Sequence, residues 1–215
     1  MTLETRLDNQ LFTMHASGAL FWNEKKILFI SDVHLGKVVH FRKNGFPIPN
    51  NAAQENFDKL MQVVTFFNPK RIVFLGDLFH STQNSEWNLF VDWCQSCPSE
   101  ITLIAGNHDV IPDFNFHEIG IEVISSLKID TFLFTHHPTT TNGFFNCSGH
   151  IHPGIILRGL GKNSLKLPCF FQQKSQLILP AFGTFTGLGI IKPKEGDQIF
   201  VLTQDEVIQV NSTFS

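Results

Sequence analysis

Five short polar clusters along the chain contain the side chains that could do chemistry. They combine carboxylates, imidazoles and one amide, and such mixed oxygen and nitrogen donors suit divalent ions such as Mn²⁺, Fe or Zn²⁺. In chain order the clusters are Asp32-Val33-His34, Gly76-Asp77, Gly106-Asn107-His108-Asp109, His136-His137 and Gly149-His150-Ile151-His152. A metal centre with a phosphate on it would satisfy these groups together. Taken alone, the third cluster could equally be a plain turn, because Asn and Asp are common turn residues.

The spacing inside the clusters predicts which side chains can share an ion. On a strand end, residues two apart point the same way, so Asp32 and His34 can bind one metal. His150 and His152 are also two apart, and in an extended segment they present their imidazoles on the same side. Each of these two histidines could serve a different ion of one pair.

Three apolar runs that are typical of strands lead into the first three clusters. They cover residues 27–30, 71–75 and 101–105. Apolar residues at helical spacing lie between them, from residue 52 to a stop at Asn68-Pro69 and again over residues 85–97. The order strand, helix, strand predicts right-handed crossovers between parallel strands. The carboxyl ends of such strands form the edge where open α/β sheets bind ligands, so we expect these clusters to meet there.

Beyond residue 121 the helical spacing disappears and short β stretches dominate. Strand candidates cover residues 127–135, 168–172, 177–182 and 199–210, and residues 183–189 are typical of a flexible break. The predicted fold class is therefore α/β, with a second, more antiparallel sheet packed against the first.

The composition is that of a folded protein with a sizeable core. The 215 residues are 42% hydrophobic and 16% charged, which favours one compact domain over a disordered chain. The formal net charge of -3 argues against a protein whose whole surface binds nucleic acid, but it leaves room for a local basic patch.

Cys94 and Cys97 fall in and near a helix face, and we interpret them as reduced thiols. Since no leader and no apolar run of membrane length is found, we expect a cytoplasmic protein without a membrane anchor.

Taken in order, the five clusters resemble the motifs of the calcineurin-like metallophosphoesterase superfamily. The resemblance covers residues 32–152. It implies a four-layer α/β/β/α sandwich, in which two packed mixed β-sheets are flanked by helices within a single domain over residues 1–215. It also implies two divalent metal ions, with Mn²⁺ as the first choice and Fe or Zn²⁺ as alternatives.

The same resemblance implies a set of metal ligands. Asp77 is expected to bridge the two ions. Either member of the pair His136-His137 could turn inward, and the family pattern favours His136. The remaining ligands are Asp32, His34 and His152 for the first ion, and Asn107, His136 and His150 for the second.

The implied reaction is metal-dependent hydrolysis of a phosphoester. Two cations would hold the phosphate oxygens and lower the pKa of a shared water, which attacks phosphorus in line. An alkoxide is a poor leaving group, so a positioned acid helps, and His108 resembles the family's candidate for that proton donor. We expect Asp109 to hold the His108 ring by a hydrogen bond, with a turn cap as the alternative role for Asp109.

The residues around the second cluster narrow the resemblance. In the phosphoprotein phosphatases of this superfamily the motif continues into an arginine-bearing turn, whereas here it continues as Leu78-Phe79-His80-Ser81. Together with residues 32–37 and 41–49, this segment looks like the bacterial phosphoesterases associated with a DNA ligase and a helicase. That resemblance implies a phosphodiesterase or nuclease acting on DNA in repair, with a ligase and a helicase as partners.

Four residues are candidate contacts for such a substrate. Lys37, Arg42 and Lys43 could meet a phosphate backbone close to the metals, and His80 could touch the substrate. The alternatives are a solvated basic loop and a surface histidine.

Two other functions stay open at this point. One is a small-molecule phosphodiesterase that acts on cyclic nucleotides. The other is a non-catalytic interaction module of the same fold. Intact ligands at every expected position argue against the module, because buried polar groups are costly to keep without a role.

Overall fold

The first sheet has seven strands, which follow one another in chain order. The structure is a computed structural model and describes residues 1–37, 52–82, 84–159, 163–184 and 186–210. The strands are β1 (Thr2–Leu7), β2 (Gln10–His15), β3 (Leu20–Trp22), β4 (Ile27–Ile30), β5 (Arg71–Phe74), β6 (Glu100–Ile104) and β7 (Glu122–Ile124). Neighbours from β1 to β4 run antiparallel, whereas neighbours from β4 to β7 run parallel.

Helices join the parallel strands, as the apolar spacing predicts. They are α2 (Ala52–Phe67), α3 (Ser85–Ser96) and α4 (Asp113–Glu118). The chain leaves α2 at Asn68, which has a φ of 44° and precedes Pro69. Asn84 caps α3, because its side-chain oxygen accepts a hydrogen bond from the backbone N–H of Glu86 at 2.8 Å. No described helix has both the length and the apolar character needed to cross a membrane.

The second sheet has nine strands of mixed direction. They are β8 (Leu127–Ile129), β9 (Phe132–Thr135), β10 (Phe145–Ser148), β11 (Pro153–Arg158), β12 (Ser164–Gln173), β13 (Gln176–Ile178), β14 (Gly189–Ile190), β15 (Gln198–Leu202) and β16 (Val207–Val210). Their order is β14-β11-β12-β13-β10-β9-β8, with β15 beside β12 and β16 beside β15. The pairs β9–β10, β10–β13 and β11–β14 run parallel and the other pairs run antiparallel, as expected for a more antiparallel sheet.

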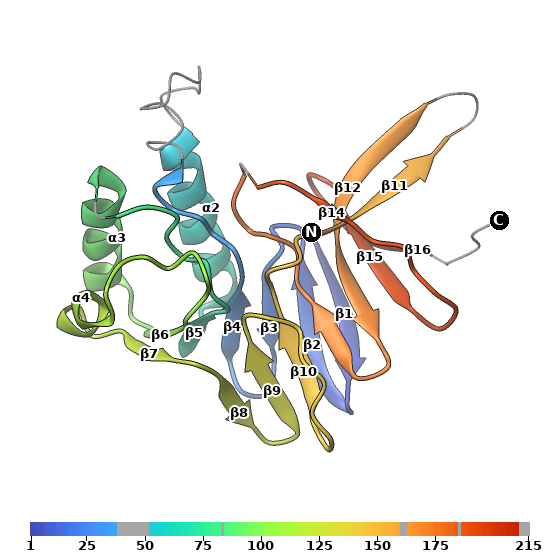
Figure 1. The fold of residues 1–215 in the computed structure, drawn as a ribbon, viewed down its shortest axis with the longest axis horizontal. Coiled ribbons are helices and arrows are strands. Elements are labelled where there is room, and N and C mark those ends of the chain that lie inside the picture. The colour runs from blue at the N-terminus through green and yellow to red at the C-terminus, as the bar shows by residue number, and fades with distance from the viewer. Residues whose placement is uncertain (38–51, 83, 160–162, 185, 211–215) are drawn as a thin grey trace.

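The helices and the two sheets stack in layers (Figure 1). The described helices cover one face of the first sheet, where Phe74, Phe90 and Phe116 belong to one apolar cluster. The other face packs against the second sheet, and there Phe29 and Phe134 stack with ring centroids 4.0 Å apart. The predicted α/β class with two packed mixed sheets is therefore confirmed.

The outer helical layer of a four-layer sandwich does not occur among the described residues. The outer face of the second sheet carries a smaller apolar cluster instead, which includes Ile155, Phe171 and Ile199. Since β12 pairs with both β11 and β15, strands rather than a helix extend over this side. In the described part of the chain the layers run helix, sheet, sheet.

Tight turns move some strand boundaries away from their predicted positions. Residues 127–135 form two strands, because the chain turns at Asp130 with a φ of 50°. Residues 199–210 form the hairpin β15–β16, in which the Thr203 N–H donates to the Glu206 carbonyl at 2.9 Å. The sequence pattern does not predict β1, which is largely exposed, or α4, which has only 6 residues.

The aromatic stack between the sheets yields a stability prediction. Replacing the fully buried Phe134 by alanine removes the partner of Phe29 and opens a cavity between the sheets, so we expect a loss of about 3–5 kcal/mol in the free energy of unfolding. Urea denaturation measures this loss. The matched control is Phe114→Ala, which removes a side chain that is 60% exposed and should change stability by less than about 0.5 kcal/mol. Equal effects of the two substitutions would contradict the assignment of the core.

Candidate metal centre

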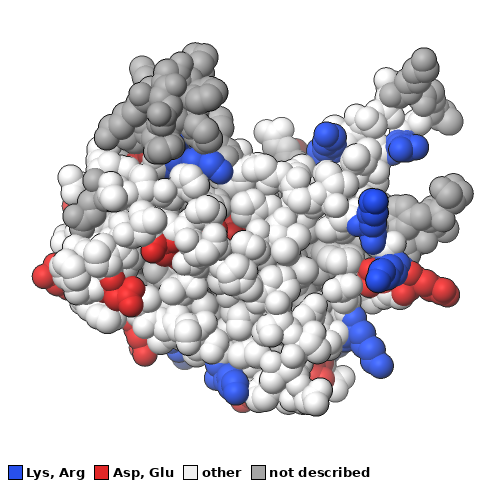
Figure 2. Space-filling model, in the orientation of Figure 1, with Lys and Arg blue, Asp and Glu red and all other residues white. Residues whose placement is uncertain are grey.

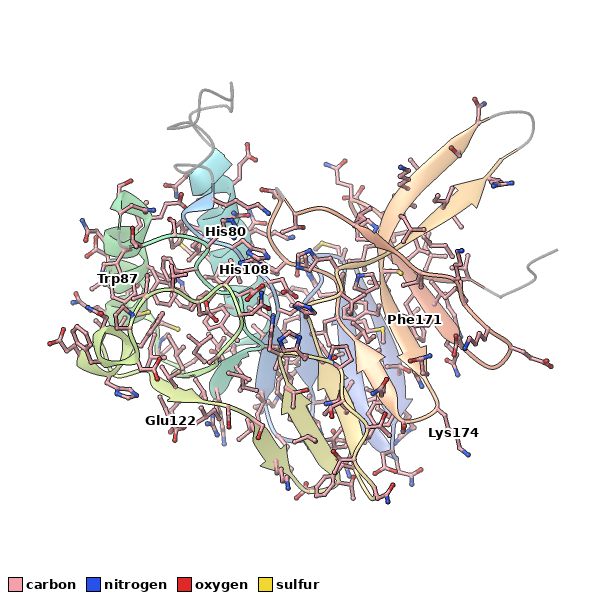
Figure 3. The ribbon with its side chains drawn as sticks, in the orientation of Figure 1. His80, Trp87, His108, Glu122, Phe171 and Lys174 are labelled. Carbon is pink, nitrogen blue, oxygen red and sulfur yellow. The ribbon has the colours of Figure 1, made fainter. Side chains whose placement is uncertain are left out.

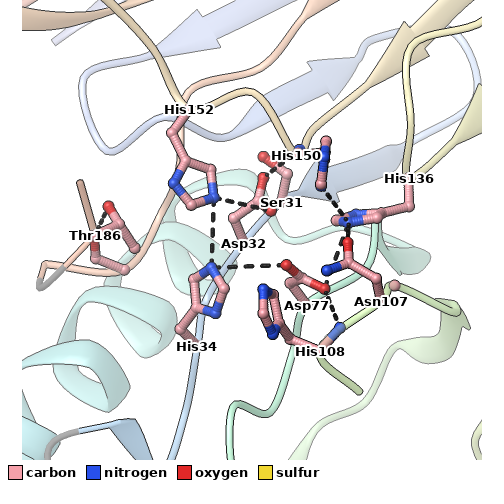
Figure 4. Close-up of polar contacts among 12 residues, drawn as sticks. Ser31, Asp32, His34, Asp77, Asn107, His108, His136, His150, His152 and Thr186 are labelled. Atoms are coloured by element: carbon pink, nitrogen blue, oxygen red, sulfur yellow. Dashed lines mark hydrogen bonds and ion pairs between the residues drawn. The ribbon is translucent and has the colours of Figure 1, made fainter. Parts of the chain in front are cut away.

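The polar clusters converge at the carboxyl edge of the first sheet (Figure 4). The His34 N–H donates to the Asp77 carbonyl at 2.9 Å, which joins the first two clusters through the backbone. The second sheet brings its histidines to the same place. In chain order the residues are Asp32 and His34 after β4, Asp77 after β5, Asn107 and His108 after β6, His136 after β9, and His150 and His152 between β10 and β11.

Asp32, His34 and His152 form one group of potential ligands, with atoms within 4.8 Å of one another. His152 Nε2 lies 3.2 Å from Asp32 Oδ1 and 3.4 Å from His34 Nε2. The Nδ1 of His152 donates to the Gly187 carbonyl at 3.2 Å, so its Nε2 carries the lone pair of the neutral ring. That lone pair faces Asp32 Oδ1, which is buried and receives no hydrogen bond within the described ranges. Two acceptors this close need a cation between them, either a proton or a metal ion.

A second group surrounds the imidazole of His136. Its Nδ1 donates to the Leu75 carbonyl at 2.8 Å, so its Nε2 also carries the lone pair of the neutral ring. Three potential ligand atoms lie around that nitrogen. They are Asn107 Oδ1 at 3.0 Å, His150 Nδ1 at 3.1 Å and Asp77 Oδ1 at 3.4 Å. Oxygen and imidazole donors that converge in this way suit a borderline divalent ion.

The buried carboxylate of Asp77 faces both groups. Its Oδ2 lies 3.8 Å from His34 Nε2, and its Oδ1 lies 3.4 Å from His136 Nε2. A carboxylate with one oxygen toward each group can hold two cations roughly 3.5–4 Å apart. The residues present therefore fit the pair of divalent ions that the motifs predict.

The backbone at the candidate ligands is strained. Left-handed φ values from 48° to 67° occur at Asp32, His34, Asp77, His150 and His152. This conformation costs an L-residue roughly 1–2 kcal/mol. The sequence predicts extended backbone at these positions, and the structure shows that they are not extended. The prediction for residues two apart still holds. Asp32 and His34 belong to the same group of ligand atoms, whereas His150 and His152 belong to different groups.

Two glycines allow the clusters to approach one another. A Cβ on Gly149 would lie 2.4 Å from Asp32 Oδ2, and a Cβ on Gly106 would lie 2.3 Å from Asp77 Oδ1. Both distances are too short for a side chain, so the site requires glycine next to its carboxylates.

Burial favours the neutral imidazole at His34 and His150. It lowers the pKa of His34 to about 3, with the nearby charge of Asp32 acting in the opposite direction. Burial also lowers the pKa of His150, and the neighbouring His137 and His136 lower it further. Because a metal ion binds the neutral ring, these side chains are ready for coordination at neutral pH.

Two further histidines border the centre, and Figure 3 shows them side by side. The ring centroids of His80 and His108 are 5.0 Å apart, and that of His80 lies 5.4 Å from the ring of His34. His108 is exposed. His80 is half-buried, and its place beside His34 keeps a contact with the substrate as a prediction.

Of the predicted basic contacts, Lys37 lies close to the centre. Burial lowers the pKa of Lys37, and the negative charge of Asp77 acts in the opposite direction, which places the ammonium within electrostatic reach of that carboxylate. Arg42 and Lys43 lie outside the described residues.

The expected hydrogen bond from Asp109 to the His108 ring is not among the contacts of the described residues. The carboxylate of Asp109 instead accepts hydrogen bonds from three backbone N–H groups. The donors are Gly106 at 2.8 Å, Asp77 at 2.9 Å and Phe79 at 3.0 Å. Asp109 thus links the turn after β5 to the turn after β6. This role is closer to the turn cap than to the predicted contact with the His108 ring. Its burial raises its pKa, and the backbone hydrogen bonds act in the opposite direction.

Both members of the pair His136-His137 reach the centre. His136 is buried, whereas His137 is exposed and its ring centroid lies 4.0 Å from that of His150. The nitrogens of all three histidines lie within 4.8 Å of one another. The sequence did not predict the carbonyls of Leu75 and Gly187 that fix the ring tautomers, because a backbone carbonyl has no side-chain signal.

Comparison with known proteins places the chain in a family. A family profile described as calcineurin-like phosphoesterase matches residues 25–209. The chain therefore belongs to the calcineurin-like phosphoesterase family and is a metal-dependent phosphoesterase. No curated protein matches the chain.

Two solved structures resemble the chain to different degrees. The nuclease MPE of Pseudomonas putida matches 98% of this chain and 100% of its own, with a TM-score of 0.80 and 23% identity, so the two share a fold. A protein of unknown function from Aquifex aeolicus matches 59% of this chain and 78% of its own, with a TM-score of 0.43 and 17% identity.

The close approach at Gly149 yields a prediction about metal binding. In Gly149→Ala the new methyl group displaces the Asp32 carboxylate, so we expect the affinity for Mn²⁺ to fall about 10–100-fold. Thermal unfolding at increasing Mn²⁺ concentrations measures this, because an ion that binds only the native state raises the unfolding temperature. Gly159→Ala is the matched control, since among the described residues its Cβ would meet nothing closer than the Asn163 carbonyl at 3.9 Å. The site assignment fails if both variants bind Mn²⁺ like the wild type.

Proposed function

We propose that this phosphoesterase is a dinuclear-metal phosphodiesterase that cleaves DNA strands, with Mn²⁺ as its working metal. The observation that supports two ions rather than one is the position of Asp77, whose oxygens face different groups of ligand atoms. In this proposal Asp32, His34 and His152 hold one ion and Asn107, His136 and His150 hold the other. The bound ions supply positive charge to the phosphate oxygens and acidify a water molecule.

His108 is the proposed proton donor for the leaving oxygen. Its backbone N–H donates to Asp77 Oδ1 at 2.9 Å, which fixes the residue at the edge of the centre while its side chain stays exposed. An exposed imidazole beside the metal ligands can reach a bound substrate. The proton is needed because an alkoxide leaves poorly without one.

Lys37 and His80 are proposed to bind the phosphate that is cleaved or its neighbours. Lys37 lies within electrostatic reach of Asp77, and the centroid of the His80 ring lies 5.4 Å from that of His34 and 5.0 Å from that of His108. Both positions border the centre without belonging to either group of ligand atoms. Arg42 and Lys43 extend the same basic segment in the sequence.

A nucleic-acid strand is the substrate that we favour. A protein with the same fold over its whole length is named a nuclease, and the local motifs resemble the phosphoesterases associated with a DNA ligase and a helicase. On the face shown in Figure 2, acidic side chains gather mostly over the helices and basic side chains mostly over the second sheet, so the net negative charge is not spread evenly. Action in DNA repair, with a ligase and a helicase as partners, is part of this proposal.

A cleavage panel tests the substrate assignment. With Mn²⁺ we expect cleavage of single-stranded or duplex DNA and of bis(p-nitrophenyl) phosphate, and little turnover of 2′,3′-cyclic nucleotides or of a phosphomonoester. Asp77→Asn replaces the carboxylate that faces both groups of ligand atoms by a neutral amide, and it should abolish cleavage of every substrate. Preferred turnover of the cyclic nucleotide would make the protein a small-molecule phosphodiesterase. If the purified protein bound no transition metal and cleaved none of these substrates, the assignment as a metal-dependent phosphodiesterase would be refuted.

The role of His108 predicts an effect that depends on the leaving group. In His108→Ala, cleavage of DNA, whose leaving group is an alkoxide, should slow about 10²–10⁴-fold. Hydrolysis of bis(p-nitrophenyl) phosphate should slow far less, because nitrophenolate leaves without a proton. Steady-state rates on the two substrates give the comparison. Equal losses on both substrates would mean that the substitution damages the metal centre, and no loss on DNA would refute the assignment.

A further inference from the structure

A cavity of about 410 Å³ lies beside a stretch of chain that also contacts the metal centre. The two share one stretch of chain, residues 182–184 and 186–188, which we call the shared segment. On one side it contacts the candidate ligands. Gly183 N–H donates to the Asp32 carbonyl at 3.1 Å, and the Gly187 carbonyl accepts from the His152 ring at 3.2 Å. On the other side Phe182, Gly183 and Thr186 line the cavity.

The cavity contains a half-buried ammonium group, that of Lys59 on α2. Its Nζ donates to the Phe182 carbonyl at 2.6 Å and lies 4.2 Å from the centroid of the Phe182 ring. No carboxylate of the described residues forms an ion pair with it. Burial lowers the pKa of Lys59 to about 8, and no negative charge of the described part of the chain acts against that shift. A cation in this position costs free energy unless an anion joins it.

The other walls of the cavity indicate what kind of anion fits. Leu167, Pro168, Leu188 and Leu202 supply apolar surface, and Thr184, Thr186, Thr203 and Gln204 supply polar groups. A ligand that uses both surfaces carries one negative group and a flat or apolar body. A nucleotide has this composition, and the cavity falls within the range of roughly 300–1,000 Å³ that is usual for small-molecule sites.

We propose that this cavity binds a nucleotide unit of the substrate strand, with a phosphate on Lys59 and the base against Leu167, Pro168 and Leu188. The inference rests on the proposed function and adds a subsite to it. The shared segment favours a unit of the strand over a separate ligand, because it contacts Asp32 and His152 at the metal centre and also lines the cavity. Lys59 then supplies the counter-charge for a neighbouring phosphate.

Chemical labelling of lysines tests the subsite without relying on turnover. The Mn²⁺-loaded wild type is acylated at pH 8 with an N-hydroxysuccinimide ester, and the labelled fraction of each lysine is read by peptide mass spectrometry. The ligands are a short thymidylate strand with hydrolysis-resistant phosphorothioate links, 5′-dTMP and inorganic phosphate. At about ten times its Kd, the strand should slow labelling of Lys59 roughly tenfold, since only the free protein reacts. Lys128 is the internal control, because its ammonium also lies over a ring, that of Phe144 at 5.0 Å, but on β8.

Variants give a second measurement of the same subsite. Lys59→Met removes the charge and should weaken binding of the strand about tenfold, as loss of a charge-assisted hydrogen bond would. Lys59→Arg keeps the charge and should retain most of the affinity. Lys128→Met is the matched control and should bind like the wild type. Thermal unfolding of each variant confirms that it is folded, and the labelling of the wild type is independent of any folding defect.

Each outcome decides between alternatives. Protection of Lys59 by the strand, with or without protection by 5′-dTMP, supports the subsite. Protection by 5′-dTMP but not by the strand would make the cavity a separate nucleotide site. Equal protection by inorganic phosphate would show that the base does not contribute to binding. No protection by any ligand would overturn the inference. If Lys59 is protected by the strand while no DNA is cleaved in the panel, the proposed activity fails and the binding site stands.

Discussion

The carboxylate of Asp77 is the point on which both halves of the metal centre depend. One oxygen faces His34 from the first sheet, and the other faces His136 from the second sheet. The backbone that carries this carboxylate is held by Asp109, which accepts hydrogen bonds from the N–H groups of Asp77, Phe79 and Gly106. Asp109 therefore acts through position: it holds the backbone of Asp77, whose carboxylate faces both groups of ligand atoms. Loss of its oxygens would leave three backbone donors unpaired.

The cost of this arrangement explains why it needs the whole fold. Five left-handed residues at roughly 1–2 kcal/mol each approach the total stability of a domain, which is about 5–15 kcal/mol. The aromatic core between the sheets, with Phe29 stacked on Phe134, supplies part of the offset. A bound cation supplies more, because it binds acceptor groups that otherwise face one another. The strain is therefore concentrated where ion binding can offset it.

The sequence predicts the parts of this protein that depend on side-chain type and chain order. The polar side chains of the first three clusters could be found because apolar strands lead into them, and the strand–helix order predicts that these clusters meet at one edge. The place of His136, His150 and His152 beside them was implied by the family resemblance. A turn cap was one of the two roles expected for Asp109, but its three partners could not be predicted, because they are backbone N–H groups that every sequence has. The turn at Asp130 was missed because a left-handed Asp leaves no break in the apolar pattern. The cavity at Lys59 joins residues near positions 59, 167, 182 and 203, and no sequence spacing brings these together.

The metal centre and the Lys59 cavity have opposite electrostatic requirements, and the shared segment lies between them. The centre gathers carboxylates and lone pairs that require cations, whereas the cavity holds an ammonium group that requires an anion. A metal ion satisfies only the first site, since positive charge near Lys59 would add repulsion. In the proposed function, a polyanionic strand would satisfy the second site directly and the first through its scissile phosphate once the ions are bound. The charge distribution of the two sites therefore favours a substrate with several phosphates over one with a single phosphate.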